Sequence, residues 1–262
     1  MDARHNLPDL VRDFDGIQIY CMFIGHPRSG HSLFGSLLDA HPEIVVAHEF
    51  NALKFIQRNT DRNELFYRLW RRSKQFTRHG RRWNGYKYKV PNQWHGRYKH
   101  LKVIGDKKGG SSTDALKSNP DLLNQLRQIV VVPVKTLHVI RNPFDNIRTV
   151  SRYYHRNRLL PAITGYFSRC AVIKQIKQTM IPGDWLDVYH EDVVADPNKA
   201  LKIACQFLGL ATTVDYLNDC ASIVFDEPRK RRFEINWSHD QRKLVEDNIG
   251  QFDWLSRYSY DH

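Results

Sequence analysis

Residues 25–32 have the types and spacing of a phosphate-binding turn. The apolar run 17–24 leads into the sequence GHPRSGHS, which opens a stretch with helical spacing. Two glycines at this spacing let backbone N–H groups turn inward, and the N-terminus of the following helix adds about half a positive charge. We therefore expect this loop to bind an anion.

The charged residues of this turn differ from those of a nucleoside triphosphatase. A loop of the form G-x-x-x-x-G-K-[ST] carries a lysine that reaches the β- and γ-phosphates. His31 occupies the lysine position, and Arg28, inside the loop, supplies the fixed positive charge instead. This exchange changes the predicted ligand.

Residues 137–149 also have the pattern of a strand, a turn and a helix. Arg141 ends the apolar run, and Pro143 suits the first turn of a helix whose free N–H groups then lie near that arginine. A guanidinium can donate two parallel hydrogen bonds to a phosphate. This stretch predicts a second anion-binding position.

Together the two stretches resemble the PAPS-dependent sulfotransferases, where PAPS is 3'-phosphoadenosine 5'-phosphosulfate. PRSGHSL at 27–33 and LLDAHP at 37–42 are similar to the family's phosphosulfate loop, P-[RK]-S-G-T-T, and its A-H-P. His31 and Ser32 replace the two threonines. RNPFDNIRT at 141–149 is similar to the family's R-[ND]-P-x-[DE]-x-x-x-S, which binds the 3'-phosphate. The resemblance covers residues 17–260 except 54–102.

The resemblance implies that PAPS is the co-substrate and that no metal ion is needed. It places five residues at the phosphosulfate: Arg28, Ser29, Gly30, His31 and Ser32. Arg141 and Thr149 would bind the 3'-phosphate at the other end of the ribose. The implied reaction is direct in-line transfer of a sulfuryl group to a hydroxyl or amine acceptor.

Such a transfer needs a base for the acceptor and a cation beside the leaving phosphate oxygen. Glu49 is the base that the resemblance implies, because tyrosylprotein sulfotransferases carry a glutamate at a similar spacing after A-H-P; His48 is the alternative. Arg28 would serve the leaving group. Lys107 resembles the lysine of the family's G-x-K-x-P stretch. A plain loop carboxylate at 49 and a surface lysine at 107 remain open.

Two later stretches resemble further landmarks of the family. VYHED at 188–192 and FLGL at 207–210 are similar to its Y-E-D-L and F-L-G-L. His190 stands where a tyrosine often contacts adenine, and a core histidine is the alternative. Arg229 and Lys230 begin a basic run that resembles a loop closing over the nucleotide, although such runs usually face solvent.

Alternating strands and helices must position these residues. The patterns predict strands at 17–24, 44–47, 101–104, 134–140 and 185–190, and helices at 32–40, 63–77, 121–129, 143–155, 163–180, 197–207 and, interrupted, 241–258. The glycine-rich residues 105–110 are interpreted as a loop. This order indicates an α/β fold of three layers, a central parallel sheet flanked by helices, with the P-loop-like sulfotransferase architecture that the resemblance implies.

Length and composition favour one domain over residues 1–262. The mean hydropathy is −0.57, and no apolar stretch comes near the roughly 18 residues of a membrane span. The four cysteines form no C-x-x-C pair, which favours core thiols and a reducing, cytoplasmic location. The oligomeric state is left open.

The net charge of +12 is concentrated in residues 54–102, where 15 Lys and Arg residues face only Asp61 and Glu64. Ten aromatic residues lie in the same segment, a mixture that suits an anionic acceptor, while a solvated basic face is the alternative. We expect an insertion that selects the acceptor. A carbohydrate, a phenol, a peptide and a lipid head group all remain open.

Two other functions compete with sulfuryl transfer. Glu191 and Asp192 follow a predicted strand as the carboxylates of an NTP-dependent kinase or GTPase would, but the missing loop lysine counts against that class. A noncatalytic nucleic-acid-binding module is supported only by the basic aromatic segment, with no zinc-binding spacing or RNP-like pattern beside it. We therefore do not expect nucleic acid as a partner.

Overall fold

A parallel sheet of five strands forms the centre of the chain in the computed structural model, which describes residues 13–57 and 60–261. The strand order is β2-β5-β1-β6-β7, and each neighbouring pair is parallel. The strands are β1 (Ile19–Gly25), β2 (Ile44–His48), β5 (Val103–Lys107), β6 (Val134–Ile140) and β7 (Trp185–Tyr189). The predicted α/β class is confirmed.

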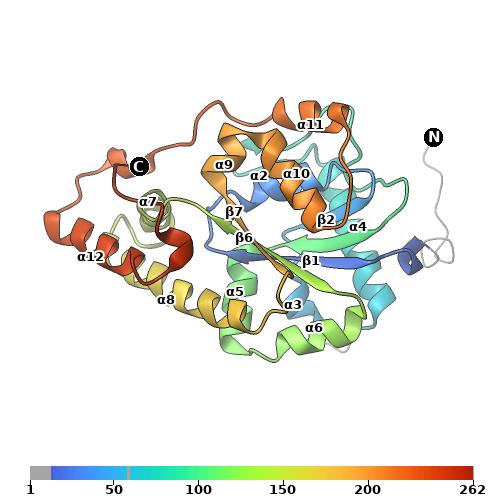
Figure 1. Cartoon of the computed structure of the whole chain (residues 1–262), viewed down its shortest axis with the longest axis horizontal. Coiled ribbons are helices and arrows are strands. Elements are labelled where there is room, and N and C mark those ends of the chain that lie inside the picture. The colour runs from blue at the N-terminus through green and yellow to red at the C-terminus, as the bar shows by residue number, and fades with distance from the viewer. Residues whose placement is uncertain (1–12, 58–59, 262) are drawn as a thin grey trace.

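Helices cover both faces of this sheet, which gives the predicted three layers (Figure 1). One face carries α3 (Ala52–Ile56), α5 (Gly109–Ser118), α6 (Leu122–Val130), α8 (Leu159–Gln178) and α12 (His239–Ile249). The other carries α2 (His31–Leu38), α9 (His190–Ala195), α10 (Pro197–Phe207) and α11 (Val214–Ala221). Helix α7 (Pro143–Tyr154) follows β6 and carries the second anion-binding motif.

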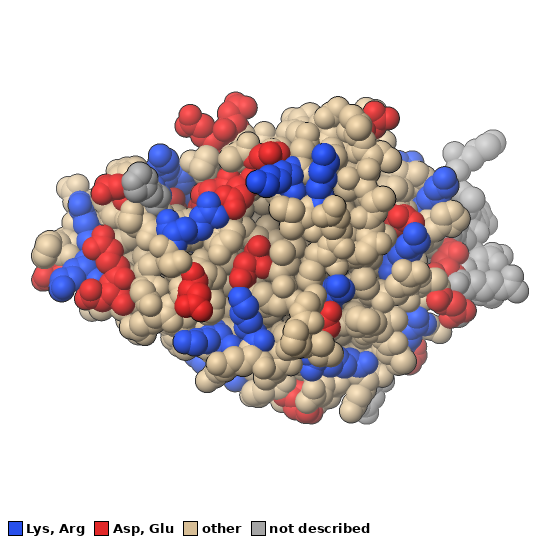
Figure 2. All heavy atoms as spheres, in the orientation of Figure 1, with Lys and Arg blue, Asp and Glu red and all other residues tan. Residues whose placement is uncertain are grey.

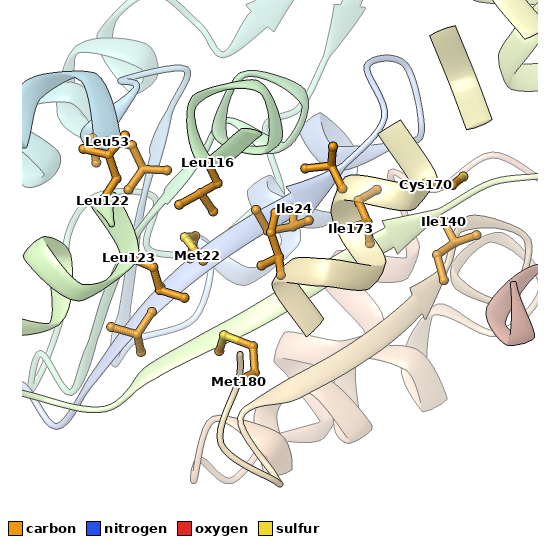
Figure 3. Close-up of a cluster of buried hydrophobic side chains, with 14 of the residues drawn as sticks. Met22, Ile24, Leu53, Leu116, Leu122, Leu123, Ile140, Cys170, Ile173 and Met180 are labelled. Atoms are coloured by element: carbon orange, nitrogen blue, oxygen red, sulfur yellow. The ribbon is translucent and has the colours of Figure 1, made fainter. Parts of the chain in front are cut away.

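The central strand β1 is buried on both sides, because alternate side chains point into two separate cores. Tyr20, Met22 and Ile24 belong to one core, and Cys21 and Phe23 belong to the other. Figure 3 shows part of the first core, with Met22 and Ile24 among leucine and isoleucine side chains of α5, α6 and α8. Double-sided burial explains why β1 reads as an unbroken apolar run.

Residues 54–102 pack apolar side chains onto the domain, while most of their basic side chains are exposed. The predicted helix at 63–77 is confirmed as α4 (Arg62–Arg78), which buries Leu65, Phe66 and Leu69 in a core shared with the sheet. A short antiparallel hairpin follows, made of β3 (Arg82–Trp83) and β4 (Tyr86–Lys87). Between these elements Arg81 is 1% exposed, so even one of the basic residues is buried.

The glycine-rich stretch 105–110 is not a loop, and this prediction was wrong. Residues 105–107 complete β5, and α5 begins at Gly109. A Cβ at Gly105 would lie 2.0 Å from the carbonyl oxygen of Cys21 on the neighbouring strand. Glycine is therefore present because two backbones approach closely, and not because the chain turns there.

Some helix boundaries also differ from the predictions. Helix α8 starts at Leu159, four residues before the prediction, because Pro161 lies in its first turn, where a missing N–H breaks no helical hydrogen bond. The interrupted C-terminal pattern is confirmed as α12 followed by the 3₁₀ turn η2 (Asp253–Leu255). The short helices α3, α9 and α11 and the ten-residue helix α5 were not predicted.

The cysteines and the helices bear on two further expectations. All four cysteines are buried and unpaired, as expected of core thiols. Among the helices of the described residues, none combines the length and the apolar character needed to cross a bilayer.

Candidate active site

The candidate residues come directly after the strands, at one edge of the sheet. The register pairs Gly25 with Val139, His48 with Lys107, and Ile140 with Tyr189, so the strands end side by side. The segments that follow carry Arg28, Glu49, Lys108, Arg141 and His190. A parallel α/β sheet binds its ligands at this edge.

The loop between β1 and α2, here called the first loop, is held in shape by its backbone and by α7. Arg28 and Gly30 have positive φ, at 70° and 97°. Gly30 caps α2 without a side-chain hydrogen bond, which leaves the first N–H groups of that helix available to a ligand. Ser29 is buried, and its Oγ accepts a hydrogen bond from Asn146 Nδ2 at 3.0 Å, while the same amide donates to the carbonyl of Pro27 at 2.9 Å. The loop and the second motif are thus joined.

The Arg28 side chain lies between α7 and the hairpin of residues 82–87. Its guanidinium carbon is 4.0 Å from the centre of the Tyr153 ring. The side-chain oxygen of Asn84 accepts from Arg28 Nη1 at 2.9 Å and from Trp83 Nε1 at 2.9 Å, in the amide orientation that satisfies both donors. The hairpin therefore orients the arginine of the loop.

His31 fills the space behind the loop with a neutral ring. Its Nε2 lies 3.1 Å from the carbonyl oxygen of Ile24, and a Cβ at Gly109 would come within 2.2 Å of the same atom. Burial lowers the pKa of His31 to about 4, so the ring carries no charge near neutral pH. The ring is turned toward the end of β1, and the backbone N–H of His31 opens α2.

Lys107 brings a buried ammonium group to the start of α2 from the neighbouring strand. It is the last residue of β5 and only 1% exposed, yet its Nζ donates to Ser32 Oγ at 3.0 Å and to the carboxylate of Glu49. Its stem passes Gly35, where a Cβ would lie 2.7 Å from Lys107 Cγ. The sequence left open a surface lysine here, and the structure instead places its charge beside a loop that has no lysine of its own.

Glu49 lies between two lysines in a left-handed backbone conformation. Its φ is 58°, and its carboxylate accepts hydrogen bonds from Lys107 and Lys108. Burial by itself raises the pKa of Glu49, but the charge and hydrogen bond of Lys107, with those of Lys108, outweigh it and lower the pKa to about 2. Glu49 is therefore ionised, and both of its partners are lysines.

Asp106 positions this turn, and sequence analysis did not identify it. Its buried carboxylate accepts from the backbone N–H groups of Phe50 at 3.1 Å and Ala52 at 2.7 Å, one and three residues after Glu49. Burial raises the pKa of Asp106 to about 6 against these hydrogen bonds. The signal that could have identified Asp106 was an acidic residue inside a fully buried strand.

His48 lies beside Glu49 but borders neither cavity described below. Its ring stacks on Phe76 at 3.9 Å and contacts the edge of Trp83 at 5.3 Å. Burial, helped by the charge of Lys107, lowers the pKa of His48 to about 2. This histidine is a packed, neutral ring.

The residues predicted to form the second anion-binding position lie where β6 meets α7. Arg141 is 8% exposed, its Nη1 lies 3.4 Å from the carbonyl oxygen of Arg28, and its Nε has no hydrogen-bond partner among the described residues. Thr149 donates its hydroxyl proton to the carbonyl of Asp145 at 2.7 Å, so its oxygen lone pairs stay available. The contact of Arg141 with the Arg28 carbonyl therefore joins the two motifs.

The basic run 229–232 divides between the site and the core. Arg232 is buried, and its backbone N–H and Nη1 donate to the Asp145 carboxylate at 2.8 and 2.7 Å, which fastens the run to α7. Arg229 and Arg231 border the same cavity as Arg141. Lys230 is exposed and does not border it.

His190, the first residue of α9, packs against the first loop. A Cβ at Gly30 would lie 2.5 Å from His190 Nδ1, so the contact requires glycine at that position. Burial and the charge of Arg141 lower the pKa of His190 to about 3. His190 is therefore a neutral ring under the loop and at the border of the cavity.

One cavity of about 840 Å³ collects most of these groups. It is bordered by the first loop, by Arg141 and Thr149, by Glu49 and Lys108, and by the hairpin. Sequence reasoning located both motifs that border it. It missed the hairpin, whose contribution rests on Asn84 and Tyr86, because contacts between distant segments leave no local pattern.

Comparison with known proteins decides the family. The model of the sulfotransferase family matches residues 22–214, a span that includes both motifs. The chain belongs to the sulfotransferase family.

Solved structures agree with this sulfotransferase in fold. The sulfotransferase domain of the Synechococcus PCC 7002 olefin synthase is 17% identical, with a TM-score of 0.55 over 94% of this chain and 97% of that one. A sulfotransferase from Alicyclobacillus acidocaldarius is 14% identical, with a TM-score of 0.51 over 91% and 96%. At these identities the likeness shows the fold alone. No curated protein matches the sequence.

The acidic pair that suggested a kinase or GTPase has structural partners in this sulfotransferase. Glu191 accepts from the backbone N–H of Asn142 at 2.9 Å and from the hydroxyl of Tyr258 at 2.6 Å. Asp192 forms two hydrogen bonds of 2.7 Å with Arg257. Both carboxylates are thus used to hold the C-terminal segment.

Charge on the visible face of the sulfotransferase is mixed. Figure 2 shows Lys and Arg side chains interspersed with Asp and Glu side chains, without a continuous basic patch on that face. Within residues 13–57 and 60–261, no three His, Cys, Asp or Glu side chains form a group that could hold a metal ion.

Proposed function

We propose that this sulfotransferase moves a sulfuryl group from PAPS to a hydroxyl or amine of an acceptor in one in-line step. The supporting observation is the 840 Å³ cavity, because the first loop and Arg141 border it together. Two separated cationic positions suit a nucleotide with anionic groups at both the 5' and 3' positions of its ribose. PAPS has that pattern of charge.

The donor-binding roles follow the two motifs. Arg28, Ser32 and the N–H groups of residues 29–32 would hold the phosphosulfate, with Ser29 and His31 shaping the loop from behind. Arg141 and the Thr149 oxygen would hold the 3'-phosphate. Arg229 would close over the nucleotide, His190 would support the loop under it, and Lys230 would add charge from outside.

Glu49 would accept the proton of the acceptor as the bond from the acceptor oxygen to sulfur forms. The bond from sulfur to the 5'-phosphate oxygen breaks, and Arg28 and Lys107 would neutralise the charge that builds there. With a pKa of about 2, the Glu49 carboxylate is a weak base while both lysines hold it. Lys108 is partly exposed at the cavity, so an anion bound there can draw it away and make Glu49 more basic.

Thermal melting and transfer assays test the proposal. We expect adenosine 3',5'-bisphosphate, the nucleotide product, to raise the melting temperature, with about 2.7 kcal/mol of added stability at 100 times its dissociation constant. ATP with magnesium should give a smaller shift. Transfer of labelled sulfate from PAPS should then appear with at least one hydroxyl acceptor. Equal shifts for both nucleotides, or binding without any transfer, would contradict the proposal.

A further inference from the structure

A second cavity, of about 740 Å³, lies between the turn after β2 and α4. Its volume falls in the range of small-molecule sites, roughly 300 to 1,000 Å³. Phe14, Phe50 and Tyr67 contribute aromatic surface to its wall. None of the donor-binding motifs borders this cavity, so the proposed nucleotide site leaves it unused.

Glu49 connects the two cavities. Among the described residues it alone borders both of them. A group that enters the second cavity can therefore reach the Glu49 carboxylate without occupying the first cavity. A separate chamber for the acceptor suits in-line transfer, because the acceptor must attack sulfur from the side opposite the departing phosphate oxygen.

Some charged side chains along α4 form ion pairs or hydrogen bonds, whereas others form few or none among the described residues. Glu64 and Arg68 pair with each other at 2.6 Å, and Asp61 caps the helix by accepting from the backbone N–H of Glu64 at 2.9 Å. Arg71 is exposed and has no hydrogen-bond or ion-pair partner among the described residues. Arg72 donates one hydrogen bond, from Nε to the carbonyl of His48 at 2.9 Å.

Two adjacent guanidinium groups thus remain at the wall, and one of them is fixed to the peptide just before the base. The geometry points to this cavity as the acceptor site, and we propose that it selects a ring-containing hydroxyl compound that also carries an anionic group, bound by Arg71 and Arg72. The aromatic wall would pack against the ring, and Glu49 would face the hydroxyl. This inference rests on the proposed function.

Matched probes test the selectivity directly. 4-Nitrophenyl β-D-glucuronide and 4-nitrophenyl β-D-glucoside differ only in a carboxylate against a hydroxymethyl group. With adenosine 3',5'-bisphosphate present, we expect calorimetry to show at least tenfold tighter binding of the glucuronide. Arg71→Ala should remove about tenfold of that affinity, Arg71→Lys should lose less, and the glucoside should change less than twofold.

Arg78→Ala is the matched control, because it removes an exposed arginine from the same helix outside the cavity. It should leave both affinities unchanged, and a thermal melt should show that each variant is folded. In transfer assays Arg71→Ala should raise KM for the glucuronide and leave kcat nearly unchanged.

Equal affinity for the two probes, no binding of either, or an equal loss in the Arg78 variant would overturn the inference. Failure of sulfuryl transfer with selective binding intact would instead overturn the proposed function. Calorimetry therefore tests the inference, and the transfer assay tests the proposed function.

Discussion

At the scale of single residues, the site depends on one carboxylate held by two lysines. Glu49→Gln keeps the shape of the side chain and removes its charge. We expect kcat to fall by about 10²-fold or more, because a neutral amide cannot accept the proton. Affinity for adenosine 3',5'-bisphosphate, measured by calorimetry, should be kept or increased, since Lys107 and Lys108 are released.

The same substitution leaves Lys107 buried without its carboxylate, so a melting curve is the necessary control. A loss of about 1–3 kcal/mol of stability is expected from that unpaired group. Turnover equal to that of the parent protein would show that Glu49 is not the base.

Arg141 allows a separate test of the nucleotide site. Arg141→Ala should weaken binding of adenosine 3',5'-bisphosphate by roughly 2 kcal/mol, because a charge-assisted pair of hydrogen bonds is lost. Arg141→Lys keeps the positive charge but loses the pair of hydrogen bonds, so its affinity should lie between those of the parent protein and Arg141→Ala. If calorimetry finds the same affinity in all three proteins, Arg141 does not bind the 3'-phosphate.

The residues of this site differ in how far the sequence could predict them. Arg28 lies in one strand-turn-helix unit, and Arg141 and Thr149 lie in another. Their places at the cavity border could be predicted, because the spacing of residues within each unit determines its local geometry. The direction of the His31 ring depends on Ile24 and Gly109, and Gly109 is far away in the sequence. Only packing between separate segments sets such contacts.

At the scale of elements, the segment 54–102 is fastened by a buried ion pair. Arg81 donates to Asp39 at 2.7 Å, to Ser36 Oγ at 3.1 Å and to the carbonyl of Tyr88 at 3.2 Å. The pair joins the end of α2 to the connection between α4 and the hairpin. The hairpin that orients Arg28 therefore depends on it.

Arg81→Met should destabilise the protein by about 3–5 kcal/mol, because it leaves the Asp39 carboxylate buried and unpaired. The double variant Asp39→Asn with Arg81→Met should recover part of that loss. Chemical denaturation measures both. A double variant less stable than Arg81→Met would show that the ion pair itself is not the source of the effect.

Elements with a clear apolar run or a proline at the helix start were predictable, and the hairpin was not. The strands β1, β6 and β7 and the helices α7 and α10 follow from apolar runs and from proline at helix starts. The hairpin pairs only Arg82 with Lys87 and Trp83 with Tyr86, so its strands have no apolar alternation. It contacts Arg28 and the His48 ring, which lie far from it in the sequence.

At the scale of the whole molecule, buried histidines make stability depend on pH. Burial lowers the pKa of seven of them: His26, His31, His41, His48, His95, His138 and His190. Their unfolded value is near 6.5, so below that pH the unfolded chain binds more protons than the folded one. Stability should fall as the pH drops from 6.5 toward 4, by up to about 1.4 kcal/mol per pH unit for each histidine.

Asp106 opposes this trend, because its pKa of about 6 in the folded state favours the folded chain as the pH falls below that value. Burial also raises the pKa of Asp39 and Asp145. The histidines outnumber these groups, so the net slope should stay positive. Denaturation across this range should show a shallower slope for His48→Gln. A flat profile in the parent protein would refute the prediction.

The sharing of Glu49 by two cavities also has a kinetic consequence. If nucleotide and acceptor occupy different chambers, the spent nucleotide can stay in place while a fresh acceptor molecule arrives. A dead-end complex then accumulates at high acceptor concentration and slows turnover. Adenosine 3',5'-bisphosphate would inhibit competitively toward PAPS and noncompetitively toward the acceptor.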